Sequence, residues 1–208
     1  MPRLMDMGLE KLNSLMLEMA TLSEDAVAEA IDAYQHGTKG HQVTEWSERL
    51  RTLHRQVSEL SMELIARYQP VASDLRYIKA CFEISYGFFR FGRYAKDITE
   101  VLEMFGDLSR CDHSRVIETA KKTQEMIRMS IDAFTRKDVE LAKQIPAMDD
   151  VVDERYRKNL REVISGTGDM KCPLSATLIL RYLERIADHA TYIAESVVYI
   201  VMGVEPAS

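Results

Sequence analysis

Two pairs of carboxylates in the second half of this 208-residue sequence have the spacing of neighbours on one face of a helix. Glu184 and Asp188 lie four residues apart in YLERIADHATYIAE, and Asp149 and Asp153 have the same spacing in AMDDVVDERY. Like charges at this spacing repel and cost an isolated helix about 0.2–0.5 kcal/mol. Solvent, an arginine or a bound cation must offset that cost.

Both pairs lie beside the apolar stripe of their own helix. The stripe around Glu184 and Asp188 alternates by four and three residues: Ile179, Leu183, Ile186, Ala190, Ile193 and Val197. Around the other pair, Asp149, Val152, Asp153 and Tyr156 follow the spacing i, i+3, i+4, i+7. If the two helices are antiparallel neighbours, the four carboxylates converge on one groove.

A convergence of four anions is unfavourable unless the anions are protonated or neutralised. Oxygen ligands on facing helices are typical of sites for Mg²⁺, Mn²⁺, Fe or Zn²⁺. The sequence therefore predicts a metal site at Asp149, Asp153, Glu184 and Asp188. The alternative is a solvated acidic face, in which Arg181 or Arg185 pairs with some of the acids.

The elements that would position these acids are all helical. Only 9 Gly and 5 Pro occur, and segments with helical periodicity are separated by short breaks such as HGTKGH and GDLSRCDHS. Asp74 is expected to cap the third helix, and Pro146 to kink or restart the fifth. The sequence predicts an all-α protein whose six helices occupy about 4–35, 42–68, 74–105, 114–135, 138–164 and 174–202.

An internal repeat divides the chain in two. IDAY at 31–34 recurs as IDAF at 131–134, and GRYAKDITE at 92–100 aligns with ADHATYIAE at 187–195. Each match joins corresponding helices of the two halves, so we expect two tandem three-helix bundles. The first bundle is predicted over residues 1–106 and the second over residues 107–208.

The first half does not repeat the acidic pattern. At the positions of Glu184 and Asp188 it carries Phe89 and Arg93, because the offset is 184 − 89 = 95 residues. On its second helix, Ser47 and Arg51 stand about where Asp149 and Asp153 stand, and nearby only Asp97 remains acidic. The sequence therefore predicts at most one metal cluster, in the second half. Phe89 and Arg93 could instead belong to a docking surface.

Charge and cysteine content exclude several classes of protein. A formal net charge of −6 argues against a nucleic-acid binder and against attachment to anionic lipid by charge. No segment has 18 uncharged apolar residues, so no membrane span is expected. Cys81, Cys111 and Cys172 are an odd number without a CxxC pair, and we expect them to be reduced thiols of a cytoplasmic protein.

The same motifs carry a family resemblance. LERIADHATYIAE resembles the signature of PhoU-type phosphate-signalling proteins, whose third helix in each half carries an ExxxD motif. QPVASDLRYIKA resembles the segment that opens that helix in the first half, and MDDVVDERY resembles its DxxxD partner. The resemblance covers essentially the whole chain in order, including its length and doubled three-helix plan.

The resemblance implies a cytoplasmic regulator of phosphate uptake and phosphate-starvation signalling. It implies contacts with the ATP-hydrolysing subunit of a phosphate transporter and with a sensor histidine kinase, and a homodimer. Family members hold multinuclear metal clusters on these motifs, often one per half. Asp149, Asp153, Glu184 and Asp188 match the family's ligand positions, whereas Tyr192 stands where an Asn or Asp is common.

Two other functions fit part of the sequence. A carboxylate-bridged di-metal enzyme usually needs Glu-x-x-His, but Ala187 stands three residues after Glu184 and His189 stands five residues after it. A metal-free helical adaptor would use the acids as a protein-binding face. No Ser, Cys or His has a convincing partner for nucleophilic catalysis, so we expect no enzyme.

Overall fold

The computed structural model describes residues 4–204, which fold into helices without any strand. Six helices are long and one has four residues. Their bounds are α1 Leu4–His36, α2 His41–Tyr68, α3 Ala72–Phe105, α4 Ser114–Arg136, α5 Val139–Ala142, α6 Ile145–Ser165 and α7 Lys171–Met202. The predicted all-α class is confirmed.

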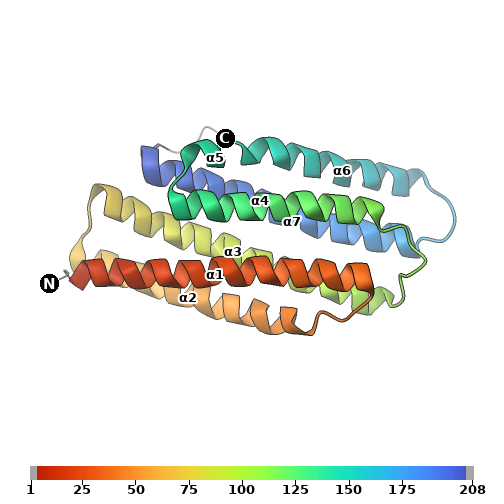
Figure 1. The fold of residues 1–208 in the computed structure, drawn as a ribbon, viewed down its shortest axis with the longest axis horizontal. Coiled ribbons are helices and arrows are strands. Elements are labelled where there is room, and N and C mark those ends of the chain that lie inside the picture. Colours follow the sequence, from red (N-terminus) through yellow and green to blue (C-terminus); the bar gives the residue numbers. More distant parts are fainter. Residues whose placement is uncertain (1–3, 205–208) are drawn as a thin grey trace.

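The helices form two three-helix bundles lying side by side (Figure 1). In the first bundle α1, α2 and α3 pack on one another, and in the second α4, α6 and α7 do so, with α5 against α4 and α7. The bundles meet where α3 packs along α7 and α1 packs along α4. The predicted division between residues 106 and 107 falls in the segment 106–113, here called the inter-repeat linker, which joins α3 to α4.

Prolines and caps set the ends of the helices around the acidic segment. The Asp138 side chain accepts a hydrogen bond from the Leu141 amide and caps α5. Pro146 stands in the first turn of α6, where backbone amides have no intrahelical hydrogen-bond partner and a proline is therefore tolerated. It restarts the helix there, as predicted. The expectation for Asp74 is wrong, because α3 begins at Ala72 and places Asp74 inside its first turn.

The core runs through both bundles and fixes how α3 and α7 approach each other. Phe88 and Phe91 of α3 are fully buried, as are Leu183 and Ile186 of α7. A Cβ atom at Gly87 would lie 3.0 Å from the Ile193 side chain, so glycine permits this close approach. The seam that holds α7 against its neighbours therefore also fixes the rotation of the helix that carries Glu184 and Asp188.

A disulfide joins Cys111 to Cys172, so the expectation of three reduced thiols is wrong. The two residues lie 61 positions apart in the sequence, but their Cα atoms are 5.4 Å apart. The inter-repeat linker passes the first turn of α7, a proximity that sequence spacing does not reveal. Cys81 is a free, buried thiol.

Within residues 4–204, no helix combines the length and apolar character needed to cross a membrane.

Candidate metal centre

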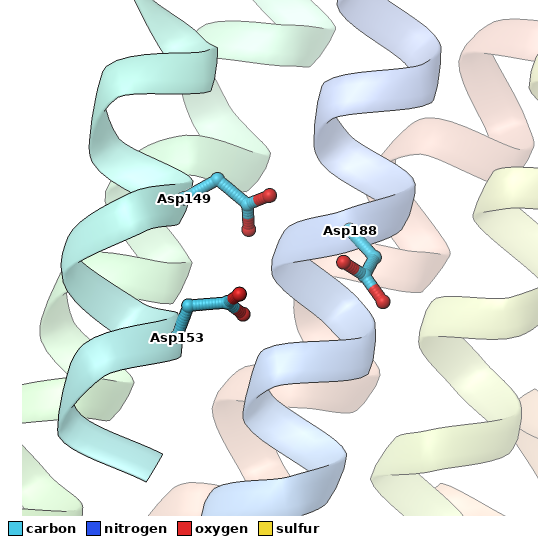
Figure 2. Close-up of side chains that lie close together, drawn as sticks. All are labelled: Asp149, Asp153 and Asp188. Carbon is cyan, nitrogen blue, oxygen red and sulfur yellow. The ribbon is translucent and has the colours of Figure 1, made fainter. Parts of the chain in front are cut away.

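Three of the four predicted acids come together between α6 and α7. One carboxylate oxygen from each of Asp149, Asp153 and Asp188 lies within 4.8 Å of the others. Figure 2 shows Asp149 and Asp153 projecting from α6 toward α7, with Asp188 on the facing part of α7. The four-residue spacing puts both α6 aspartates on one face, and packing of α6 on α7 brings that face to Asp188.

Glu184, the fourth predicted ligand, lies one turn away on α7 and is not within this group of three. It is 8% exposed, and its Oε1 atom accepts a hydrogen bond of 2.5 Å from Arg181. Its other oxygen, Oε2, lies 3.7 Å from Arg185 Nε, which is too long for a hydrogen bond. Glu184 is therefore held beside the three aspartates by an arginine rather than among them.

Arginines flank the other acids as well. Arg157 Nη2 lies 2.7 Å from Asp153 Oδ2, and Arg185 Nη1 lies 3.1 Å from Asp188 Oδ2. The partner of Asp153 was not predicted, although its i, i+4 spacing from that aspartate is a readable signal. These arginines reduce the repulsion between the carboxylates. The predicted alternative, in which arginines pair with some of the acids, therefore describes part of the site.

The arginines leave several carboxylate oxygens without a hydrogen bond. Asp149 Oδ1, Asp153 Oδ1 and Glu184 Oε2 are buried atoms with no hydrogen-bond partner. A buried acceptor that has lost water without gaining a donor costs about 1–3 kcal/mol, and more when it is charged. A cation bound between α6 and α7 would supply the missing partner of these three oxygens.

The acids also disturb one another's ionisation. Burial, followed by repulsion from Asp188 and Asp153, raises the pKa of Asp149 to about 7. Burial and the charge of Asp188 raise the pKa of Glu184, against the opposing effect of Arg181. Burial also raises the pKa of Asp188, opposed by Arg185. Near neutral pH without a cation, Asp149 therefore holds a proton for much of the time.

The donor set fits a hard or borderline cation. Asp149, Asp153 and Asp188 offer oxygen ligands alone, from two helices held by a fully buried seam, and oxygen-only sites suit Mg²⁺ and Mn²⁺ as well as iron or zinc. Glu184 could join through its unpartnered Oε2 atom. When bound, such an ion would neutralise the carboxylates and displace the proton from Asp149.

His189 is directed away from the carboxylates, as its spacing predicts. Its ring lies among tyrosines, with centroid distances of 5.8 Å to Tyr86, 6.0 Å to Tyr94 and 5.8 Å to Tyr192. Burial, aided by the charges of Arg90 and Arg185, lowers the pKa of His189 to about 4. A neutral imidazole in this aromatic setting neither ligates the candidate cation nor neutralises the acids.

At the equivalent place in the first bundle, the side chains form no carboxylate cluster within the described residues. Arg93 Nη2 pairs with Asp97 Oδ1 at 2.9 Å, and Arg51 Nη2 pairs with Glu48 Oε2 at 2.5 Å. Ser47 is buried. At this place the first half thus pairs its acids with arginines instead of gathering carboxylates.

Phe89, the counterpart of Glu184, stacks on a histidine. Its ring lies parallel to that of His54, with an interplanar angle of 9° and a centroid distance of 5.8 Å. The His54 Nδ1 atom is 2.9 Å from Ser85 Oγ, which fixes the imidazole. Where the second bundle has a buried carboxylate, the first therefore has an aromatic pair between α2 and α3.

The comparison with protein families agrees with this doubled architecture. The family model described as "PhoU domain" matches the chain twice, over residues 16–102 and 116–197. The chain belongs to the PhoU family. The two matched segments are the two bundles, so the metal candidate and its altered counterpart occupy equivalent places in two copies of one PhoU domain.

Relatives of similar length support the assignment. Phosphate-specific transport system accessory protein PhoU homologs from Pseudomonas aeruginosa and Pseudomonas putida are 32% and 33% identical to it, over 95% of this chain in both cases. The matches cover 85% and 80% of those relatives. The crystal structure of PhoU from Pseudomonas aeruginosa superposes with a TM-score of 0.89 at 32% identity, covering 96% of this chain and 99% of that one.

A second solved structure shows the fold at greater distance. The phosphate transport system regulatory protein PhoU from Streptococcus pneumoniae has a TM-score of 0.77 at 19% identity, covering 98% of this chain and 100% of that one. The PhoU architecture thus persists while most side chains differ.

Proposed function

We propose that this PhoU-family chain is a cytoplasmic regulator of phosphate uptake and phosphate-starvation signalling that carries one metal site, in its second bundle. It acts by binding partners rather than by catalysis. The proposal rests chiefly on one observation, the convergence of Asp149, Asp153 and Asp188 with oxygens that lack hydrogen bonds, within a PhoU domain. The names of its relatives supply the phosphate connection.

In this proposal the three aspartates hold the ion and Glu184 supports it. Asp149 is the residue that changes most, because its pKa of about 7 means that binding releases a proton near neutral pH. Arg157 and Arg185 orient Asp153 and Asp188 through their outer oxygens. The ion would be Fe, Zn²⁺, Mn²⁺ or Mg²⁺, and its role would be to hold α6 against α7 and present a fixed surface.

The proposed partners are the ATP-hydrolysing subunit of a phosphate transporter and a sensor histidine kinase, with the chain acting as a homodimer. The relatives' description as accessory proteins of a phosphate-specific transport system supports the transporter as a partner. Binding should be measurable by biolayer interferometry with the purified ATP-hydrolysing subunit. A saturable signal supports this part of the proposal. The absence of a signal at about 50 µM subunit contradicts it, because a dissociation constant of that size corresponds to a binding free energy of about −6 kcal/mol.

A metal-free adaptor remains a second candidate because of the arginines. Asp153, Glu184 and Asp188 each have an arginine within 3.1 Å, so arginines neutralise part of their charge without any metal ion. In that case the groove would bind a basic segment of a partner. The two candidates differ in one property, since the adaptor needs no stoichiometric metal.

Elemental analysis of the purified chain decides between them. We expect one or more transition-metal ions per chain after incubation with Fe²⁺, Mn²⁺ or Zn²⁺ and gel filtration, and none in the Asp149→Asn/Asp153→Asn variant. Asp97→Asn is the matched control, because it removes an acid from the first bundle and should leave the metal content unchanged. Absence of metal from the unmodified chain after all three incubations would reject the metal site and favour the adaptor.

A further inference from the structure

We propose that the Cys111–Cys172 disulfide is a reversible thiol–disulfide exchange site. A dithiol reductant opens it and thereby releases the inter-repeat linker from the second bundle. This inference rests on the cytoplasmic location in the proposed function, but not on its metal site or its partners. It concerns a part of the molecule outside the carboxylate cluster, and its test needs neither metal nor partner.

The position of the disulfide makes it a tie between the linker and a helix end. Cys111 belongs to the linker, and Cys172 lies in the first turn of α7. Lys171 Nζ donates a hydrogen bond of 2.7 Å to the Asp107 carbonyl, so a noncovalent contact joins the same two segments. Opening the disulfide would leave this exposed hydrogen bond as the link between Asp107 and α7, while Leu108 keeps the start of the linker buried in the core.

Both cysteines are partly exposed, which gives a reductant access to the bond. Disulfides are uncommon in reducing compartments, where those present are usually transient or redox-sensing. A long-lived structural disulfide would instead be expected in a secreted protein. Partial exposure of both residues is thus a property that an exchange site requires and that a fully buried disulfide lacks.

The exchange balances with a dithiol as the electron donor. One thiolate of the reductant attacks Cys111 Sγ, the Sγ–Sγ bond breaks, and Cys172 leaves as a thiolate. The amides of the first turn of α7 stabilise that negative charge, so Cys172 is the better leaving group. The reductant's second thiolate attacks the mixed disulfide and releases Cys111. Two electrons reach the protein, its thiolates take two protons, and the reductant becomes a disulfide.

The third cysteine cannot take part in this exchange. Cys81 is fully buried in α3, and burial raises the pKa of its thiol to about 12. The thiolate is the reactive form, so Cys81 is inert while the chain is folded. It provides an internal reference for counting thiols.

The neighbouring contacts indicate that the bundle survives reduction. Arg115 Nη1 donates to Asn159 Oδ1 at 2.8 Å and lies 2.6 Å from Glu162 Oε2, which links α4 to α6. Asn159 Nδ2 in turn donates to Thr177 Oγ1 at 2.8 Å and links α6 to α7. These bonds hold the three helix ends together without the disulfide. Reduction should therefore loosen the linker and leave the helices in place.

Thiol counting tests whether the bond exists and exchanges. In urea without reductant, we expect one thiol per chain to react with a chromogenic disulfide reagent, and three after dithiothreitol treatment and desalting. The Cys81→Ala variant should have no reactive thiol before reduction and two reactive thiols after it. Three thiols in both samples, including after incubation with oxidised glutathione, would overturn the proposal.

Limited proteolysis tests the release of the linker. Arg110 is an exposed trypsin site immediately before Cys111. We expect dithiothreitol to raise the rate of cleavage after Arg110 about tenfold or more, measured by mass spectrometry of the fragment that begins at Cys111. The Cys111→Ser/Cys172→Ser variant should be cut at the fast rate with or without dithiothreitol, and Cys81→Ala should respond like the unmodified chain. An unchanged rate on reduction of the bond would overturn control of the linker.

Thermal unfolding separates loosening from loss of the fold. Opening a loop of this length should lower Tm by roughly 5–15 °C while the far-ultraviolet helical signal at 25 °C is kept. Loss of the helical signal at 25 °C in both the reduced chain and the double serine variant would show that the disulfide is required for folding, and would overturn its role as an exchange site.

Discussion

In the second bundle α6 and α7 face each other with Asp149, Asp153 and Asp188, whereas in the first bundle α2 and α3 carry Ser47, Arg51, Phe89 and Arg93 at the corresponding places. The long helices of the two bundles correspond one to one. What differs is the row of side chains next to each apolar seam. In one bundle that row gathers negative charge, and in the other it pairs Arg93 with Asp97 and stacks the partly buried ring of Phe89 on His54.

This difference shows that the buried apolar seam and the row of side chains beside it have separate roles: the seam determines the fold, and the row determines the local charge. The seam residues are fully buried in both bundles, as Phe88 and Leu183 illustrate, and they hold the three-helix arrangement. The neighbouring row contacts solvent in part, so a change there alters charge and ligand chemistry at small cost to the fold. Two copies of a PhoU domain can therefore differ in this row of side chains and keep the same architecture.

The most severe way to break the contrast is to give the second bundle the arginine of the first. Asp188→Arg should weaken metal binding about 1000-fold or more, equivalent to about 4 kcal/mol, because a ligand is lost and a positive charge enters the groove. Calorimetric titration with Mn²⁺ or Zn²⁺ would measure it. Arg93→Ala in the first bundle should leave the affinity unchanged, and equal affinity of all three proteins would refute the assigned site.

The reverse exchange should cost stability without creating a site. Phe89→Glu/Arg93→Asp removes the ring that stacks on His54 and leaves Asp97, whose side chain is 12% exposed, facing another anion. We expect a loss of about 2–4 kcal/mol in the free energy of unfolding, measured with urea. Metal content should not rise, since Ser47 and Arg51 supply no carboxylate. A doubled metal content would show that two positions alone separate the bundles.

Removing one carboxylate from the cluster should stabilise the metal-free protein. The pKa of Asp149 is about 7 in the folded chain, above its ordinary value of 3.8, so stability of the metal-free form falls as pH rises between these values. Asp149→Asn should therefore gain about 1–2 kcal/mol at pH 8 and little at pH 4, after allowance for solvent screening.

The control for this pH dependence is Asp150→Asn, which makes the same change of charge on an exposed neighbour. Urea unfolding of the three proteins in chelator at several pH values would test it. If Asp149→Asn and Asp150→Asn had the same pH dependence, burial of Asp149 and repulsion from the neighbouring acids would not be the cause.

The smallest expected effect is on stability, when one arginine from each bundle is replaced by alanine. Arg181→Ala leaves the buried Glu184 without its hydrogen bond and should destabilise the metal-free chain by about 1 kcal/mol. Arg51→Ala removes an exposed pair with Glu48 and should change stability by less than about 0.5 kcal/mol. Equal losses would mean that burial at Glu184 has no energetic consequence.

The sequence by itself determined the helices, their order and the doubled plan. Helical periodicity is local, and Pro146 acts on its own segment, so both could be read without a structure. The repeat pairs identified which helices correspond, and the four-residue spacing placed Asp149 beside Asp153. The absence of acids at Phe89 and Arg93 was equally readable.

Tertiary structure decided which of these residues meet. The packing of α6 on α7 brings Asp188 to the α6 aspartates, and this outcome does not follow from spacing within one helix. The prediction of three reduced thiols missed the Cys111–Cys172 bond for the same reason. The pairing of Arg181 with Glu184, three residues apart on α7, is a local contact that the sequence offered as an alternative. Spacing along a helix determines which residues share a face of that helix. Contacts between residues of different helices depend on the rotation and axial position of each helix, which core packing sets.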